Sequence, residues 1–371
     1  RLAGILDTGS SGLVVFGKRC TGCGGAAAYD ERASDSFVRG RRQRALEYCS
    51  GSCQAEEAEE DVTMGPFMAR GTTVWTAVSC EMPLLQHAAF NAVLGFAPPG
   101  REEKRIREEL DQARALAARY EAAGLAVPEE VSEREQRWGS DLAGALAQAP
   151  LPQALGLQSF SVCLGRVSGS HGYLVWNDTT QALLPGALRP ALVDASSWSI
   201  SLRGLGLEQR GAPGVRLGCD SGCSALLDTG TSLLGVPGAV YRRLRGALAQ
   251  MRPSCSDLRT FPDLVFEVGG GTARLPPDAY VGSVDGAGDG LARIGTRREP
   301  CSLLLFDTGG GAAPALVLGM PFFREYYTTF GFGDRSLVLS PAGDGCEPGS
   351  TDLRRAARPE GPVRPRAIDA S

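Results

Sequence analysis

Short apolar runs separated by clusters of Gly, Pro and Ser make up most of this 371-residue chain. The clearest runs are GLVVFG, TTVWTAVSC, SFSVCL, GYLVWN, PDLVFEVGGG and PALVLG. Apolar runs of this length, bounded by residues that favour turns, are typical of β-strands joined by tight connections. The pattern therefore predicts a mainly β protein.

Residues 101–148 break this pattern and are expected to form a helical insertion. From Arg101 to Ala123 the sequence is dense in Arg, Glu and Ala, and its apolar residues recur every three or four positions, which predicts a helix with one apolar face. These residues are Ile106, Leu110, Ala113, Ala117 and Tyr120. Gly124 and Pro128 are expected to end this helix, and a second, shorter helix is expected at Asp141–Gln148. We interpret the insertion as a solvated element on a β scaffold; a docking helix for a partner or propeptide is the alternative.

The composition narrows the classes of function. A length of 371 residues with 43% hydrophobic residues is enough for two domains with substantial cores. The net charge of −4 argues against nucleic acid as the main partner, because phosphate binding needs a basic surface. No apolar stretch is long enough to predict a membrane span. Residues 346–371 hold four Pro, five Arg and few large apolar residues, which predicts a disordered tail.

Eleven cysteines are a high number for a chain of this size. Several occur at close spacing, namely Cys20 with Cys23, Cys49 with Cys53, and Cys219 with Cys223. We interpret them as disulfides formed in an oxidising compartment. A zinc site built from the first two of these pairs is the alternative. The sequon at Asn177 is a candidate glycosylation site and also fits a secretory route.

The tripeptide Asp-Thr-Gly occurs three times, beginning at Asp7, Asp228 and Asp307. The first two follow apolar strands and are followed by hydroxyl-bearing residues, which can hydrogen-bond a carboxylate. An apolar–apolar–Gly run ends at Gly95, 88 residues after Asp7 (95 − 7), and another at Gly319, 91 residues after Asp228 (319 − 228). Two units of similar layout are therefore predicted, with Asp7 and Asp228 facing each other across a cleft. Asp307 is followed by glycines and is interpreted as a turn residue.

These segments resemble the pepsin-like aspartic proteases. DTGSSGLVVFGKRC and CDSGCSALLDTGTS are similar to the two active-site motifs of that family, and EYCSGSCQA resembles its flap hairpin. NAVLGFA and LVLGMPFFREYYTTF resemble the segments that complete its two lobes. The resemblance covers nearly all of residues 1–345 and implies a bilobal β fold with a cleft between the lobes. We expect the N-terminal lobe at 1–165, the C-terminal lobe at 166–345 and the tail at 346–371.

The resemblance implies an aspartic-type endopeptidase with Asp7 and Asp228 as catalytic residues. Two carboxylates a few ångströms apart share one proton, so one activates a water while the other polarises the peptide carbonyl, and activity is expected at acidic pH. The residues expected to support the carboxylates are Thr8, Gly9, Ser10, Thr229, Gly230 and Thr231. The residues expected to close over the substrate as a flap are Tyr48, Gly51 and Ser52.

The same resemblance implies a peptide or protein substrate, no cofactor and no metal. It also implies a monomer of the secretory pathway, vacuolar, lysosomal or extracellular. Family members have a further strand before the first Asp, so the missing strand, a signal sequence and any propeptide are expected upstream of Arg1. The disulfides that the resemblance favours or allows are Cys219–Cys223, Cys255–Cys301, Cys20–Cys23, and Cys163 with either Cys346 or Cys80.

Two departures from the family pattern concern the flap. Val14 stands seven residues after Asp7, where the family usually has a Trp that hydrogen-bonds the flap Tyr. Cys49 and Cys53 bracket the flap tip, and we hypothesise a disulfide between them because facing positions at the ends of a short hairpin loop can be bridged. The missing Trp keeps open an alternative function, a binding or inhibitor protein of the same fold that is weakly active or inactive.

Overall fold

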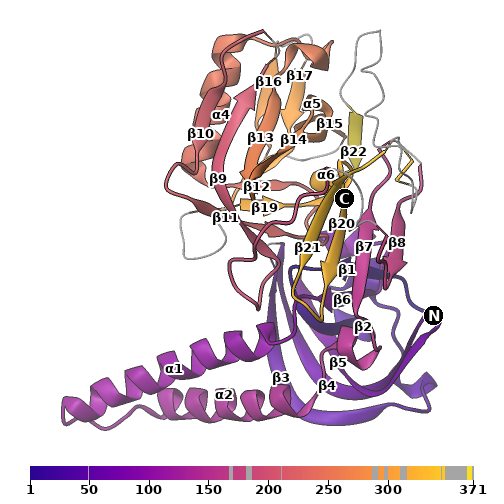
Figure 1. Cartoon of the computed structure of the whole chain (residues 1–371). Coiled ribbons are helices and arrows are strands. Elements are labelled where there is room, and N and C mark those ends of the chain that lie inside the picture. Colours follow the sequence, from indigo (N-terminus) through magenta and orange to yellow (C-terminus); the bar gives the residue numbers. More distant parts are fainter. Residues whose placement is uncertain are drawn as a thin grey trace. The chain divides into compact units, whose positions relative to one another are not determined.

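The computed structural model of the chain describes residues 1–48, 50–166, 170–180, 186–209, 211–285, 291–295, 300–309, 316–343, 345–346 and 366–369. These form two compact units, Arg1–Leu157 and Gln158–Ser371, and both are built mainly of strands, as the apolar runs predict (Figure 1). The division falls before strand β7 (Ser159–Cys163), because this strand pairs with β20 (Tyr326–Gly331) of the second unit. The expected boundary after residue 165 lies close to this division and stays a prediction.

A six-stranded sheet in the order β1-β6-β2-β5-β4-β3 forms most of the first unit. Its strands are β1 (Gly4–Asp7), β2 (Ser11–Thr21), β3 (Val38–Tyr48), β4 (Gly51–Met64), β5 (Phe67–Glu81) and β6 (Ala92–Phe96). Single 3₁₀ turns occur at Gly24–Ala26, Glu31–Ala33 and Pro83–His87. The strands β3, β4 and β5 are joined as long antiparallel neighbours that curve together along one side of the unit (Figure 1).

The core of the first unit is built on β2, the strand that follows the first Asp-Thr-Gly turn. Val14 and Phe16 of β2 are buried, as are Trp75 and Ala77 of β5. The two strands are parallel neighbours, with Val14 opposite Trp75. Burial of this apolar stretch ties the position of the turn to the packing of the whole sheet.

Two antiparallel helices form the predicted insertion and lie side by side (Figure 1). They are α1 (Arg101–Ala122) and α2 (Glu129–Ala147), and a short helix α3 (Leu151–Ala154) follows. Ile106, Leu110 and Ala113 are the buried residues of α1, on the face that their spacing predicts.

The second helix is longer than predicted, because it begins at Glu129 rather than Asp141. Pro128 precedes it, and Glu129 and Glu130 occupy its first turn. Acidic residues stabilise the positive end of a helix, so this stretch carries a start signal that apolar spacing alone does not reveal.

The described residues of the second unit form three sheets, in the orders β14-β13-β9-β11-β19-β12-β18 with β10 paired to β9, β16-β17-β15-β22, and β21-β20-β7-β8. Its first strands are β8 (Tyr173–Trp176), β9 (Ser199–Glu208), β10 (Val215–Gly218), β11 (Cys223–Leu227), β12 (Leu234–Val236), β13 (Asp263–Val268) and β14 (Gly271–Leu275). The later ones are β15 (Val281–Asp285), β16 (Arg293–Gly295), β17 (Pro300–Leu303), β18 (Leu305–Asp307), β19 (Leu316–Leu318), β21 (Leu337–Pro341) and β22 (Arg366–Asp369).

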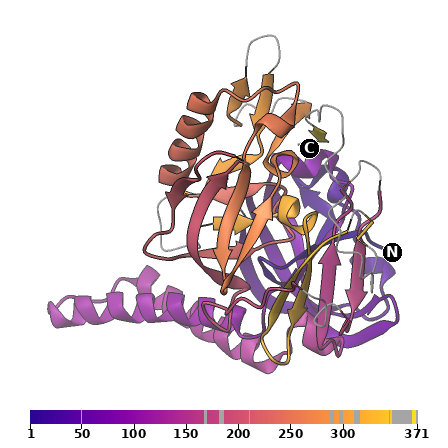
Figure 2. The same ribbon diagram turned by 45° about the horizontal axis from the view of Figure 1, so that its top comes forward.

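Helices are few in the described part of the second unit. They are α4 (Gly238–Met251), α5 (Pro277–Tyr280), α6 (Met320–Phe323) and a 3₁₀ turn at Leu258–Thr260. The helix α4 lies beside β10, as two views of the ribbon show (Figure 2). Its buried residues, Val240, Leu244 and Leu248, recur every four positions and so share one face. No helix in the described part of the chain is long and apolar enough to cross a membrane.

The prediction of a disordered tail is wrong at its far end. Arg366–Asp369 form strand β22, which pairs in parallel with β15. An added edge strand is held by backbone hydrogen bonds, so it does not need the large apolar residues that the tail lacks. Residues 347–365 lie outside the described part of the chain.

Five disulfides occur among the described residues. Four of them were predicted or left open by the sequence, namely Cys20–Cys23, Cys163–Cys346, Cys219–Cys223 and Cys255–Cys301. The fifth joins Cys53 to Cys80, so the hypothesised Cys49–Cys53 bridge is wrong. Strand register decides the pairing: Cys53 on β4 lies directly opposite Cys80 on β5, with the Cα atoms 4.1 Å apart. Cys49 lies outside the described residues.

Candidate active site

The first Asp-Thr-Gly turn connects β1 to β2. Asp7 is the last residue of β1, and the backbone N–H of Gly9 donates to its Oδ1 at 2.8 Å. The hydroxyl of Ser10 donates to Oδ2 at 2.5 Å. Thr8, which lies between Asp7 and Gly9 in the sequence, is fully buried. Both carboxylate oxygens are therefore held by the turn itself.

The second turn repeats this arrangement in the second unit. Asp228 follows β11, and its backbone N–H donates to the carbonyl of Leu318 on β19 at 3.0 Å. The N–H of Gly230 donates to Asp228 Oδ1 at 2.9 Å, and the hydroxyl of Thr231 donates to Oδ2 at 2.5 Å. Thr229 is buried, like its counterpart in the first turn. The same donors thus hold the same carboxylate oxygens in both turns.

A glycine from a later strand packs tightly against each turn. Gly95 of β6 lies opposite Asp7, and a Cβ on Gly95 would come within 2.6 Å of the backbone N of Gly12. Gly319 follows β19, and a Cβ there would lie 2.3 Å from the carbonyl oxygen of Thr231. Only glycine allows such a close approach of two backbones. The two apolar–apolar–Gly runs therefore complete the two turns, as their spacing predicts.

Asp307 shares only part of this geometry. It ends β18, and the N–H of Gly309 donates to its Oδ1 at 2.8 Å. The residue three positions after Asp307 is Gly310, which has no hydroxyl to hold the second oxygen. β18 pairs with β12 in parallel, so Asp307 lies opposite Val236. In the described part of this turn, the third tripeptide therefore has the glycine donor but no counterpart of the hydroxyl donor found at Asp7 and Asp228.

Two antiparallel strands lie where the resemblance predicts the flap. β3 and β4 are antiparallel, with Tyr48 opposite Gly51 and Ser52 opposite Glu47. A Cβ on Gly51 would lie 2.0 Å from the carbonyl oxygen of Glu81, and its φ of +138° also requires glycine. Burial raises the pKa of Tyr48, and the negative charge of Asp7 raises it further. The phenol therefore stays neutral and lies within electrostatic reach of Asp7.

The ring of Trp75 lies beside Val14, the position at which the sequence lacks the Trp that is usual in the family. Val14 is buried, and Trp75 lies opposite it on β5 and belongs to the same core cluster. Tyr48 packs against this cluster. The sequence did not identify Trp75 as part of the site, because only the register between β2 and β5 brings it to Val14.

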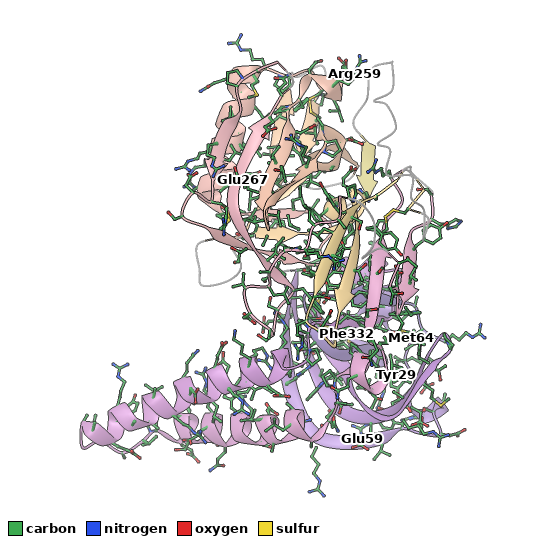
Figure 3. All side chains as sticks on the ribbon, in the orientation of Figure 1. Tyr29, Glu59, Met64, Arg259, Glu267 and Phe332 are labelled. Atoms are coloured by element: carbon green, nitrogen blue, oxygen red, sulfur yellow. A yellow bond between two sulfur atoms is a disulfide. The ribbon has the colours of Figure 1, made fainter. Side chains whose placement is uncertain are left out.

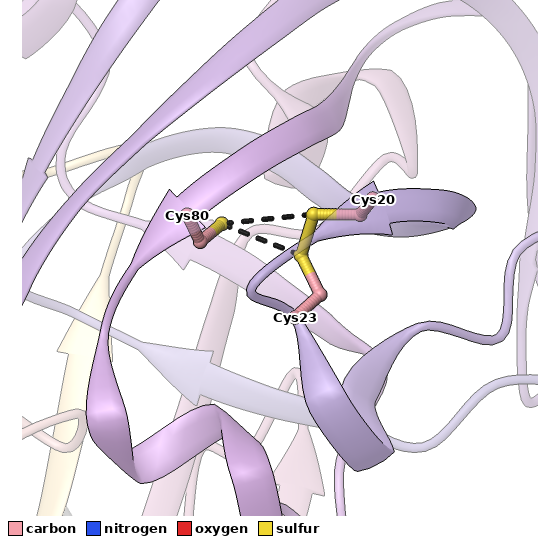
Figure 4. Close-up of side chains that lie close together, drawn as sticks. All are labelled: Cys20, Cys23 and Cys80. Atoms are coloured by element: carbon pink, nitrogen blue, oxygen red, sulfur yellow. Dashed lines mark hydrogen bonds between the residues drawn. A yellow bond between two sulfur atoms is a disulfide. The ribbon is translucent and has the colours of Figure 1, made fainter.

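A cluster of sulfur atoms lies in the first unit (Figure 4). The Sγ of Cys80 is 3.4 Å from that of Cys23 and 4.0 Å from that of Cys20. These three atoms are close enough to share a metal ion, but Cys20 is bonded to Cys23 and Cys80 to Cys53. Metal ions bind the thiolate form of cysteine, so these disulfides are not zinc ligands as they stand.

Asn177, the candidate glycosylation site, is exposed, and its side-chain oxygen already accepts hydrogen bonds. Asn177 follows β8, and its Oδ1 accepts from the backbone N–H of Gln158 at 2.8 Å and of Ser159 at 3.3 Å. A glycan would attach to the amide nitrogen rather than to this oxygen. Glycosylation at Asn177 stays a prediction.

Comparison with known proteins agrees with the two-turn geometry. The family model for eukaryotic aspartyl proteases matches residues 2–119 and 150–342. The chain belongs to this family. The unmatched residues 120–149 include the end of α1 and all of α2, so this part of the helical insertion is additional to the shared fold.

The relatives are pepsin-like proteases of moderate similarity. Gastricsin from Cavia porcellus is 25% identical over 349 residues, which cover 91% of this chain and 76% of the relative. Renin from Rattus norvegicus is 26% identical, with 88% of this chain and 72% of the relative covered. Pepsin A from Bos taurus is 22% identical, with 91% and 79% covered. The similarity extends through both units and is not confined to the motifs.

Proposed function

We propose that this member of the family is an aspartic-type endopeptidase in which Asp7 and Asp228 act as a pair. The observation that carries the proposal is the repetition of one turn geometry in two units. In each turn a glycine N–H and a hydroxyl hold opposite oxygens of one carboxylate. Among the residues of its turn that the structure describes, Asp307 receives only the glycine N–H bond.

The chemistry follows from the properties of two neighbouring carboxylates. They share one proton, because two adjacent negative charges are costly. The ionised carboxylate takes a proton from water as the water attacks the peptide carbonyl, and the protonated one donates a hydrogen bond to the carbonyl oxygen. Proton return to the leaving amine completes the cleavage. The pair must hold one proton, so activity is proposed at acidic pH.

The wider setting is part of the same proposal. The substrate is a peptide or protein, which Tyr48, Gly51 and Ser52 of the flap would cover. The protein would act as a monomer in the secretory pathway, vacuolar, lysosomal or extracellular, and the disulfides support an oxidising compartment.

Cleavage of a peptide library from pH 3 to pH 7 tests this function directly. Asp7→Asn and Asp228→Asn are each expected to lower kcat/KM by about 10³-fold or more, because each removes one acid–base group. Asp307→Asn is the matched control and is expected to stay within about twofold of the wild type. Cleavage that survives both of the first two substitutions would refute the pairing.

One further outcome would support the alternative function. Val14 in place of the usual aromatic residue changes the surroundings of Tyr48. Binding of a peptide analogue without cleavage at any pH, by a protein shown to be folded, would indicate a binding or inhibitor protein of this fold.

A further inference from the structure

Three distant segments of the first unit meet at one carboxylate. Glu102 lies in the first turn of α1, and its Oε1 accepts from Nη1 of Arg44 on β3 at 2.5 Å. Its Oε2 accepts from the hydroxyl of Ser11, at the start of β2, at 2.8 Å. Arg105 also donates to Oε1, at 2.9 Å. Both oxygens of Glu102 are therefore engaged, and the carboxylate links the helical insertion to the sheet.

Arg44 is enclosed where it meets this carboxylate. Its side chain is only 11% exposed, and its Cζ lies 3.9 Å from the ring centroid of Trp75, within cation–π range. A Cβ on Gly12 would lie 3.2 Å from Arg44 Nη2, and Gly12 has a φ of +87°. The guanidinium is thus held between an aromatic ring and the backbone that follows the first Asp-Thr-Gly turn.

The charges of this pair act strongly on each other. Burial alone would raise the pKa of Glu102, but Arg44, Arg105 and the Ser11 hydroxyl outweigh it and lower the pKa to about 2. Burial lowers the pKa of Arg44, and the charge of Glu102 opposes this. Both groups therefore stay ionised through the acidic range in which an aspartic protease works, and together they add no net charge.

Both members of the pair are connected to functional groups. Ser11, bound by Glu102, is the neighbour of Ser10, whose hydroxyl holds Asp7 Oδ2. Arg44 precedes Tyr48 by four positions on β3, and its charge lowers the pKa of Tyr48, against the effect of Asp7. Glu102 thus contacts the strand that leaves the first turn, and Arg44 acts electrostatically on the flap tyrosine.

We propose that Arg44 and Glu102 are positioning residues for the Asp7 turn and the flap, with Glu102 contributed by the helical insertion. The proposal rests on the proposed function of Asp7. Glu102 holds Ser11, and so fixes where the strand leaves the turn, while Arg44 holds the flap strand against the same point. Because the two charges cancel, they position these segments without biasing the protonation of Asp7.

If Arg44 and Glu102 position the Asp7 turn, removing either charge should change the protonation of Asp7, whereas an ion pair that only stabilises the fold would not have this effect. Removing one charge leaves the other uncompensated near Asp7. An uncompensated Arg44 favours the ionised form of Asp7, and an uncompensated Glu102 disfavours it. The other titratable groups that act on the pair are Arg105 on α1, Asp141 on α2 and the neutral Tyr48 on β3.

The test compares pH profiles of kcat/KM for Glu102→Gln and Arg44→Met with that of the wild type. We expect the acidic limb to move to lower pH in Glu102→Gln and to higher pH in Arg44→Met, each by roughly half a pH unit. The double variant is expected to return the limb toward its original position. Glu102→Asp keeps the charge, so its profile should not shift even if kcat falls.

The outer part of the helical insertion offers a matched control. Arg114 of α1 and Glu135 of α2 form an exposed ion pair at 3.1 Å, and polar side chains project from both helices along their length (Figure 3). Arg114→Met and Glu135→Gln are expected to leave the profile unchanged. Shifts in the same direction for Glu102→Gln and Arg44→Met, or lost stability with no shift, would overturn the proposal.

A second readout separates this proposal from the proposed function. A ¹³C NMR titration of the Asp7 carboxyl, assigned with Asp7→Asn, is expected to show the same opposite shifts in the two variants. This result does not require cleavage, so it supports or contradicts the positioning role even if the wild type cleaves no peptide. An unchanged Asp7 titration in both folded variants would contradict it.

Discussion

Asp7 and Asp228 are each oriented by two donors from their own turn. Hydrogen bonds to a carboxylate favour its ionised form and also restrict its rotation. We therefore expect the hydroxyls of Ser10 and Thr231 to act in two ways, by stabilising the charged form of the carboxylate that each one holds and by fixing its orientation. Losing one of them should change the pH profile as well as the rate.

Substitution of either hydroxyl tests this dual effect. Ser10→Ala and Thr231→Ala are each expected to lower kcat roughly tenfold and to move the acidic limb to higher pH, because the ionised carboxylate loses a hydrogen bond worth about 1.5–3 kcal/mol. Peptide cleavage measured across pH checks both effects. Ser232→Ala, at an exposed neighbour of Thr231, is the control and is expected to match the wild type. An unchanged pH profile in both alanine variants would contradict this role.

Gly95, which packs against the first Asp-Thr-Gly turn, gives a prediction about stability. Gly95→Ala places a methyl group within 2.6 Å of backbone atoms, so it is expected to destabilise the protein by about 1–3 kcal/mol or more. Gly139, in α2, has no atom within 4 Å of the added Cβ. Gly139→Ala should therefore stabilise by about 0.5–1 kcal/mol, because alanine favours a helix.

Urea unfolding of the two variants checks this difference. Equal effects would show that the close packing of Gly95 against the first turn is not required.

At the scale of the elements, a disulfide joins strand β4 to strand β5 close to the tip of the predicted flap. Cys53 joins β4 to β5 through Cys80, five positions after Tyr48 along the chain (53 − 48). A cross-link at this place restricts how far the described part of β4 next to the tip can separate from β5.

Peptide mapping under non-reducing conditions tests this cross-link. We expect a fragment that joins Cys53 to Cys80, and a lower unfolding temperature for the Cys53→Ser/Cys80→Ser variant, since removing a native disulfide typically costs about 2–5 kcal/mol. A fragment that joins Cys53 to Cys49 would show the pairing to be different.

The helical insertion combines two kinds of contact along its length. Near the sheet, Ile106 and Leu110 are buried, and Glu102 meets Arg44. Farther out, α1 and α2 are joined by exposed pairs such as Arg114 with Glu135. Exposed pairs contribute little, so the base of the insertion holds it to the first unit.

For the whole molecule, the depressed pKa of Glu102 predicts how stability depends on pH. The folded-state value of about 2 lies below the ordinary value of 4.5, so the folded state binds this proton less readily than the unfolded state. The stabilisation is complete above about pH 4.5 and is lost progressively as the pH falls towards 2.

Unfolding free energies measured from pH 6 to pH 2 test this dependence. Glu102→Gln is expected to lose stability at pH 6 but to show a smaller further loss between pH 4.5 and pH 2 than the wild type. Parallel curves for the two proteins would show that Glu102 does not contribute to the pH dependence.

Much of the fold could be predicted from local patterns. The apolar runs became β2, β5, β7, β8, β13 and β19, and the helical spacing located α1. The start of α2 was placed too late, since its first turn is marked by charge rather than by apolar spacing. Strand β22 was not predicted, because its sequence has no strand pattern of its own and the strand is held by pairing with β15.

The sequence by itself determined the two Asp-Thr-Gly turns and the donors that hold them, because those hydrogen bonds span two or three positions and depend on residue type alone. The tertiary structure decided the partners of Cys53, Val14 and Glu102. These partners lie far away along the chain. Strand register and helix packing bring them together. A slip of one residue in register would turn Cys53 and Val14 to the opposite faces of their strands.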